Sequence, residues 1–158
     1  MTRRATLFLG IFAFLLAACS PSPPEQALTG EGWEFLGWHQ MDDVRRDPAE
    51  FFTSTDDLEA ALEVQVQQPA NSEALLLVIN DNSDGCGPEV VDDVVGTTTG
   101  LNLIQAVDET DQACVDALFP GSMIFAVETS LLPDHDGQVM IDNDWMAFLG
   151  PVTIDVPG

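Results

Sequence analysis

The stretch that decides the fold is Ala74-Leu75-Leu76-Leu77-Val78-Ile79. It is a continuous apolar run of strand length, which is typical of a buried central strand. The six residues after it, Asn80-Asp81-Asn82-Ser83-Asp84-Gly85, have the composition of a turn, because Asn, Asp, Ser and Gly accommodate turn backbone conformations. We therefore predict a sheet organised around a strand at residues 74–79, with a turn directly after it.

Downstream of this turn, short segments of strand composition alternate with turn signals. The predicted strands lie at residues 89–95, 101–107, 123–127, 139–141 and 152–156. The predicted connections are turns at residues 96–100 and 133–137 and a longer loop at 108–121, while residues 145–149 are ambiguous. Strands at this regular spacing predict an antiparallel β-sandwich or rolled sheet.

Upstream, the aromatic stretch Trp33-Glu34-Phe35-Leu36-Gly37-Trp38-His39 predicts another strand, whose rings either fill the core or form an exposed ligand platform. Asp47 and Pro48 are suited to the cap and first position of a short helical turn at residues 47–52. A second helix is predicted at residues 56–65, with Ser54 or Thr55 as its cap. The fold class is therefore mainly β with minor α (α+β), with one or two short N-terminal helices.

The N-terminus has the layout of a secretory signal. Arg3 and Arg4 precede an apolar run at residues 7–16, and small residues lead to Cys19. Residues 20–25, Ser-Pro-Ser-Pro-Pro-Glu, are typical of an extended, semi-rigid spacer. We predict a signal peptide at residues 1–18, a Pro/Ser-rich tether at 19–30 and a single β-rich domain at 31–158.

The motif Leu16-Ala17-Ala18-Cys19 resembles the lipobox of bacterial lipoproteins. That resemblance implies lipid on the Cys19 sulfur, with acyl chains such as palmitate holding the protein to a membrane. Ser20 stands where Asp tends to retain a lipoprotein in the inner membrane. It therefore implies the outer membrane if the cell has one, and otherwise the outer face of the cell membrane. The alternatives are an ordinary cleaved signal and, given Arg3-Arg4, twin-arginine rather than general secretory export.

Cys86 and Cys114 remain as a pair after Cys19 is assigned to lipid. In an oxidising compartment an even pair favours a disulfide, which would stabilise the fold by roughly 3–4 kcal/mol. A metal or redox pair is the alternative, although the sequence has no Cys-x-x-Cys motif.

The charge balance excludes nucleic acid as a partner. The chain has 4 Lys+Arg against 27 Asp+Glu and a formal net charge of −23, so its surface repels phosphate backbones. Arg45 and Arg46 are the only cations after the signal, and they are expected to pair with local carboxylates or to form an anion site. The dispersed acids indicate a solvated surface, with cation binding as the alternative.

Asn80, Asn82 and Asp84, followed by Gly85, are weak calcium candidates. Oxygen ligands at alternate positions before a glycine resemble the first half of a calcium loop. Val91 occupies the position of the acid that closes such a loop, and Asx-rich turns also form for backbone reasons alone. We therefore predict no metal and no cofactor, and interpret the segment as a turn.

The sequence contains no Gly-x-Ser-x-Gly, Ser-x-x-Lys or His-Glu-x-x-His motif and no lysine, so no catalytic residue is predicted. Two classes of function remain. The first is a non-enzymatic interaction or binding module of the cell envelope with a possible envelope protein partner. The second is an extracytoplasmic hydrolase with an unrecognised active site, which a cavity lined by His39 or His135 with a nearby Ser or Asp would favour.

The order of elements also resembles the small β-rich lipoproteins related to the C-terminal domain of the protease-complex subunit PrcB. The likeness covers residues 34–127: a helix bearing Phe51-Phe52, the strand at 74–79, a Gly/Cys turn, two hairpin strands and a strand after Cys114. It implies a protein-interaction module without catalytic residues. Gly85-Cys86-Gly87-Pro88 stands where that family has a Gly-Gly-Tyr-like turn.

Overall fold

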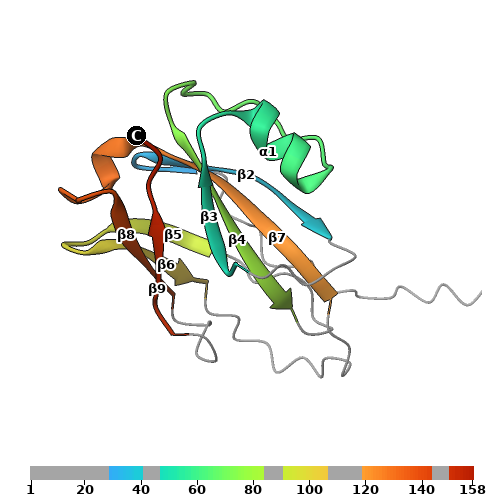
Figure 1. The fold of residues 1–158 in the computed structure, drawn as a ribbon. Helices are drawn as coiled ribbons and strands as arrows, with labels where there is room; N and C mark the ends of the chain where they lie inside the picture. The colour runs from blue at the N-terminus through green and yellow to red at the C-terminus, as the bar shows by residue number, and fades with distance from the viewer. Residues whose placement is uncertain (1–28, 41–46, 84–90, 107–118, 144–149) are drawn as a thin grey trace, which may run out of the picture.

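A computed structural model describes residues 29–40, 47–83, 91–106, 119–143 and 150–158, which form two β-sheets and one α-helix (Figure 1). The five-stranded sheet has the order β1-β2-β7-β4-β3 and consists of β1 (Thr29–Gly30), β2 (Trp33–Gln40), β7 (Phe119–Val127), β4 (Leu75–Ser83) and β3 (Ala49–Phe52). The four-stranded sheet has the order β5-β6-β8-β9 and consists of β5 (Val91–Gly96), β6 (Gly100–Gln105), β8 (Gln138–Asn143) and β9 (Val152–Asp155). Helix α1 (Thr55–Leu62) and the 3₁₀ turn η1 (Thr129–Leu131) complete these elements.

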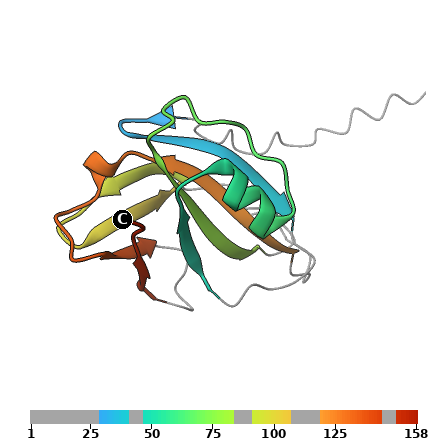
Figure 2. The same cartoon turned by 45° about the horizontal axis from the view of Figure 1, so that its top comes forward.

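The predicted mainly β, sandwich-like fold with minor α is confirmed. One face of the five-stranded sheet packs against the four-stranded sheet through a shared apolar core. The opposite face is covered by α1, which Figure 2 shows in front of the sheet. The molecule therefore has a helix, a five-stranded sheet and a four-stranded sheet in successive layers.

Strands β4 and β7 lie at the centre of these layers and are buried on both faces. Leu75, Leu77 and Ile79 belong to the core between the sheets, whereas Leu76 and Val78 pack toward α1. This double burial explains why the run at residues 74–79 is apolar without alternation, and it confirms the prediction of a buried strand.

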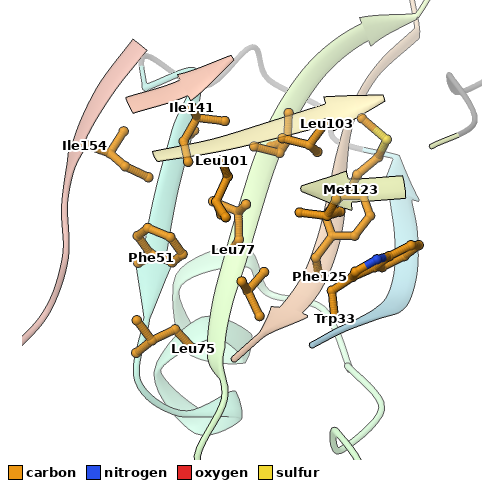
Figure 3. Close-up of a cluster of buried hydrophobic side chains, with 14 of the residues drawn as sticks. Trp33, Phe51, Leu75, Leu77, Leu101, Leu103, Met123, Phe125, Ile141 and Ile154 are labelled. Carbon is orange, nitrogen blue, oxygen red and sulfur yellow. The ribbon is translucent and has the colours of Figure 1, made fainter. Parts of the chain in front are cut away.

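The aromatic stretch of β2 contributes to the core, so the ligand-platform alternative is wrong. Trp33 is buried, and Phe35 and Trp38 pack against the same cluster. The Phe125 ring of β7 lies 6.1 Å from the Trp33 ring, centroid to centroid (Figure 3). The Phe35 ring lies 5.3 Å from the Phe125 ring. Trp38 packs over Gly121, where an added Cβ would lie only 2.4 Å from the ring.

Helix α1 follows the sequence prediction closely. Ser54 is its cap, and the Ser54 hydroxyl accepts a hydrogen bond of 3.2 Å from the Asp57 amide. Leu58 and Leu62 are buried on the face that contacts the sheet. The helix ends at Leu62, before the predicted residue 65, because Glu63 adopts a left-handed conformation with φ of 57°.

The predicted helical turn at residues 47–52 is wrong, because Ala49–Phe52 forms strand β3. Its main chain pairs antiparallel with β4, in the register Phe51 to Leu77. Ala49 and Phe51 are buried and Glu50 is exposed, which is the two-residue period of a strand. Pairing with β4 therefore overrides the local helix-start signal of Asp47-Pro48.

The predicted turn at residues 80–85 and loop at 108–121 also need correction. Strand β4 continues to Ser83, and β7 begins at Phe119, with Ser83 opposite Phe119 in the register. Residues 84–85 and 108–118 lie outside the described residues. At the N-terminus, β1 (Thr29–Gly30) occupies the last two residues of the predicted tether.

The four-stranded sheet is not wholly antiparallel as predicted, because β6 and β8 run parallel. Their register places Leu101 opposite Ile141. The two strands approach closely at Gly100, where an added Cβ would lie 1.7 Å from the Met140 carbonyl oxygen. Glycine is therefore required at residue 100 for these strands to pair.

Candidate functional site

Several predicted site residues lie outside the described residues. These are Cys19, Cys86, Cys114, Arg45 and Arg46. Lipid attachment to Cys19 and the Cys86–Cys114 disulfide therefore stay predictions. Among the described residues, no helix is both long and apolar enough to cross a bilayer.

Of the three calcium candidates, only Asn80 has a described side chain. It lies in β4, where its Oδ1 accepts a hydrogen bond of 2.6 Å from the Ser122 hydroxyl and its Nδ2 donates to the Asp47 carbonyl. Asn82 is also part of β4 and not of a turn, whereas Asp84 lies outside the described residues. In the described ranges, no three His, Cys, Asp or Glu residues gather closely enough to hold a metal ion.

His39, Ser122 and Asn80 lie side by side in the register of β2, β7 and β4. Ser122 is fully buried, and its hydroxyl proton is directed to Asn80. Burial lowers the pKa of His39 from its ordinary value, so the neutral imidazole is favoured. Because the Ser122 hydroxyl is buried and already donates a hydrogen bond, this row links strands and presents no free nucleophile.

Three surface clefts lie among the described residues. The smallest, about 130 Å³, lies beside the start of α1 and is lined by Thr53, Ser54, Thr55, Gln68, Pro69, Ser72, Ala74 and Leu76. A cleft of about 630 Å³ is lined in part by residues of β3 and β9, the edge strands of the two sheets, and Asp47 and Asp155 are among the residues that line it. Neither His39 nor His135 lines any of the three.

The third cleft, about 700 Å³, combines acidic and apolar side chains, and we call it the β5 cleft. It lies between the β1–β2 turn, strand β5 and the segment that follows β7. Its lining residues are Glu31, Gly32, Asp93, Val94, Val95, Gly96, Thr97, Glu128, Ser130, Leu131, Leu132 and Pro133. Three carboxylates and an apolar wall therefore face one opening.

Asp93 is held in this cleft by two neutral donors. A β-bulge between Val91 and Asp93 interrupts the regular alternation of β5. The Asp93 Oδ1 atom accepts hydrogen bonds of 2.9 Å from the Trp33 indole nitrogen and 2.8 Å from the Val94 amide. The first of these bonds joins the two sheets, so the position of the Asp93 carboxylate is fixed by the core residue Trp33.

Glu128, which also lines the β5 cleft, is held by similar contacts. Its carboxylate accepts hydrogen bonds of 3.1 Å from the Asn71 amide nitrogen and 3.3 Å from the Ser130 hydroxyl. Its main-chain N–H donates to the Gly32 carbonyl at 2.8 Å. Both bonds to the carboxylate come from uncharged donors, and the described residues include no lysine or arginine that could pair with it.

The sequence offered little signal for this site. Asp93, Glu31 and Glu128 belong to no recognisable motif in the sequence. The three acids come from segments far apart in the chain, and the pairing of the strands brings them together. The apolar segment Leu131-Leu132-Pro133 after a predicted strand was the one local feature that could have drawn attention to this wall.

Comparison of the chain with protein-family models, with curated proteins and with solved structures finds no match. The resemblances to lipobox lipoproteins and to PrcB-related domains therefore stay hypotheses. In the second resemblance one element changes, since Phe51-Phe52 lies in β3 and the helix before β4 is α1.

Proposed function

We propose that this chain is a lipid-anchored cell-envelope protein whose β-rich domain is a non-enzymatic binding module for an envelope protein. The anchor is supported by the order of a charged start, an apolar run, Leu16-Ala17-Ala18-Cys19 and a Pro/Ser-rich tether. We place it in the outer membrane if the cell has one, and otherwise on the outer face of the cell membrane.

The observation that carries the binding role is the β5 cleft, an open site of fixed acidic and apolar groups on a filled core. Binding sites commonly combine apolar walls with a few positioned polar groups. The resemblance to PrcB-related domains also favours a protein partner. The hydrolase alternative receives less support, because neither histidine lines a described cleft and the Ser122 hydroxyl donates to Asn80.

Cys19→Ala is expected to abolish incorporation of labelled palmitate and to leave the signal peptide uncut by the lipoprotein-specific peptidase. The reason is that the thiol is the acceptor of the lipid in the proposed anchor. The measurement is metabolic labelling with a fatty-acid analogue, followed by membrane fractionation and intact mass. Cys86→Ala is the matched control and should retain the label. A wild-type chain without label would refute the anchor.

We also propose that Cys86 and Cys114 form a disulfide. An exported chain with two cysteines left after lipidation favours this pairing over free thiols. Alkylation of the envelope-derived protein should leave Cys86 and Cys114 unmodified until reductant is added, as measured by intact mass. Reduction should lower the unfolding free energy by roughly 3–4 kcal/mol. Two thiols that alkylate without reductant would contradict the pairing.

A further inference from the structure

We propose that the β5 cleft binds a basic peptide segment of a partner protein. An arginine or lysine of that peptide would lie beside Asp93 and Glu128, and an adjacent apolar side chain would lie against Val95 and Leu132. This inference rests on the proposed binding function and names the chemical class of its partner.

The β5 cleft carries acidic side chains that have no basic partner among the described residues. The chain has no lysine, and its arginines are Arg3, Arg4, Arg45 and Arg46, all outside the described residues. The described residues therefore provide no lysine or arginine to neutralise Glu31, Asp93 or Glu128. In a chain of net charge −23 these acids add to a negative potential that attracts cations from solution. A cationic group of the partner would complement these three carboxylates.

The apolar wall of the β5 cleft favours a peptide over a metal ion or a small polycation as the ligand. Val95 is 38 % exposed, and it is the one large hydrophobic residue classed as exposed in the described part of the chain. It lies in the same cleft as the half-buried Leu131 and Leu132. A metal ion would leave this wall in water, whereas a peptide that alternates basic and apolar side chains would cover both parts.

The β5 cleft is already formed and held by close packing and hydrogen bonds. Glycine at residue 96 allows the Leu131 carbonyl to approach, since an added Cβ would lie 2.4 Å from that oxygen. The hydrogen bond of 2.9 Å from the Trp33 indole to the Asp93 carboxylate holds β5 in place. The hydrogen bond of 2.8 Å from the Glu128 main-chain N–H to the Gly32 carbonyl holds the segment after β7 against the β1–β2 turn. A site whose groups are held before binding loses little conformational entropy when its ligand arrives.

Arginine suits this site better than lysine. Its planar guanidinium donates to several oxygens at once and is more weakly hydrated than an ammonium group. Each carboxylate already accepts hydrogen bonds from uncharged protein groups, and a carboxylate can accept about four in all. The remaining acceptor sites of Asp93 and Glu128 are therefore open to a guanidinium.

The test uses the full chain purified from membranes in neutral detergent and a short fluorescein-labelled peptide of alternating arginine and leucine. Fluorescence anisotropy measures binding in about 0.15 M sodium chloride, where long-range attraction is screened beyond about 8 Å. The matched probe has citrulline, a neutral isostere, in place of arginine, and spermidine serves as a competitor without apolar groups. The arginine peptide is expected to bind at least about tenfold more tightly than the citrulline peptide.

Asp93→Asn and Glu128→Gln remove charge but keep the oxygen that accepts the bonds from Trp33 and Asn71. Each is expected to weaken the binding of the arginine peptide about tenfold. Glu31→Gln, in an exposed turn, gives a third test if Asp93→Asn fails to fold. Glu73→Gln and Asp136→Asn change net charge equally outside the cleft and should have no effect. Val95→Thr should weaken binding, unlike Val152→Thr at the other large cleft.

Equal effects of cleft and control variants would mean non-specific attraction and would overturn the proposal. Displacement by spermidine as effective as displacement by unlabelled peptide would also overturn it, in favour of a small polycation. Chemical cross-linking in intact envelopes distinguishes failure of the β5 cleft assignment from failure of the proposed binding function. An envelope protein captured equally by wild type and by the cleft variants would overturn the cleft assignment alone, whereas no captured protein would overturn the binding module itself.

Discussion

Replacement of Phe125 by alanine is expected to lower the free energy of unfolding by about 3–5 kcal/mol. Phe125 is fully buried on β7, in the core between the two sheets, and its ring contacts both Trp33 and Phe35. Truncation removes apolar contact and leaves a cavity that two packed sheets cannot readily close. Since domains of this kind are stable by about 5–15 kcal/mol, the loss is a large share of the total.

Denaturant unfolding followed by far-ultraviolet circular dichroism measures this effect without relying on tryptophan emission, which the loss of the Phe125 ring would itself change. Phe52→Ala is the matched control, because Phe52 is only partly buried at the edge of the α1-facing cluster. It should cost clearly less than Phe125→Ala. A cost below about 1 kcal/mol for Phe125→Ala would be inconsistent with a close-packed interface between the sheets.

Replacement of Gly100 by alanine is expected to destabilise the protein by about 3 kcal/mol, the upper end of the usual cost of overpacking, although it adds a single methyl group. The new Cβ would lie 1.7 Å from the Met140 carbonyl oxygen and 2.6 Å from the Met140 nitrogen. Both atoms belong to the main chain of the parallel strand β8, so no change of rotamer can relieve the overlap. The two strands must separate, and the hydrogen bond of 3.0 Å from the Met140 amide to the Thr99 carbonyl is strained with them.

Gly158→Ala is the control for this substitution, because nothing lies within 4 Å of a Cβ at that residue. Its effect should stay within about 0.5 kcal/mol of zero. Both variants are measured by thermal and denaturant unfolding of the full chain. A Gly100→Ala protein as stable as Gly158→Ala would mean that β6 and β8 do not pair in the parallel register of Leu101 with Ile141.

The sequence predicts well those elements whose local composition matches their environment in the fold. The runs at residues 74–79 and 123–127 are apolar throughout because both faces of β4 and β7 are covered. The cap residue Ser54 and the apolar positions Leu58 and Leu62 predict helix α1. In these elements local composition and tertiary environment agree, so no long-range information is needed.

The errors arise where a distant strand determines the conformation. Asp47-Pro48 is a good local helix start, but β4 is available for Ala49–Phe52 to pair with. Asn80 has turn composition, yet in β4 its side chain finds partners in Ser122 and the Asp47 carbonyl. The parallel pairing of β6 with β8 likewise depends on the path of the chain between the two strands, which local composition does not determine. Local propensity for a helix or a turn is weak in comparison with such tertiary contacts.

The candidate site is harder to predict from the sequence than the strands are. Glu31, Asp93 and Glu128 are three acids among 27 acidic residues, and no spacing distinguishes them from the others. Their common cleft exists because the β1–β2 turn, β5 and the segment after β7 meet at one end of the sandwich. The sequence does show that lysine and arginine are scarce, and the proposed cationic partner rests on this charge balance.

The double burial of β4 and β7 has a consequence for the chain before it is folded. Leu75–Ile79 and Met123–Val127 are uncharged, β-forming and apolar, which is the composition of segments that pair between molecules into aggregates. Each is shielded by the other, and they are separated by a long stretch of sequence, so the protective contact forms late in comparison with local structure. Mutual repulsion between chains of charge −23 keeps unfolded molecules apart during that interval. The abundant carboxylates thereby oppose aggregation of the chain until β4 and β7 have paired with each other.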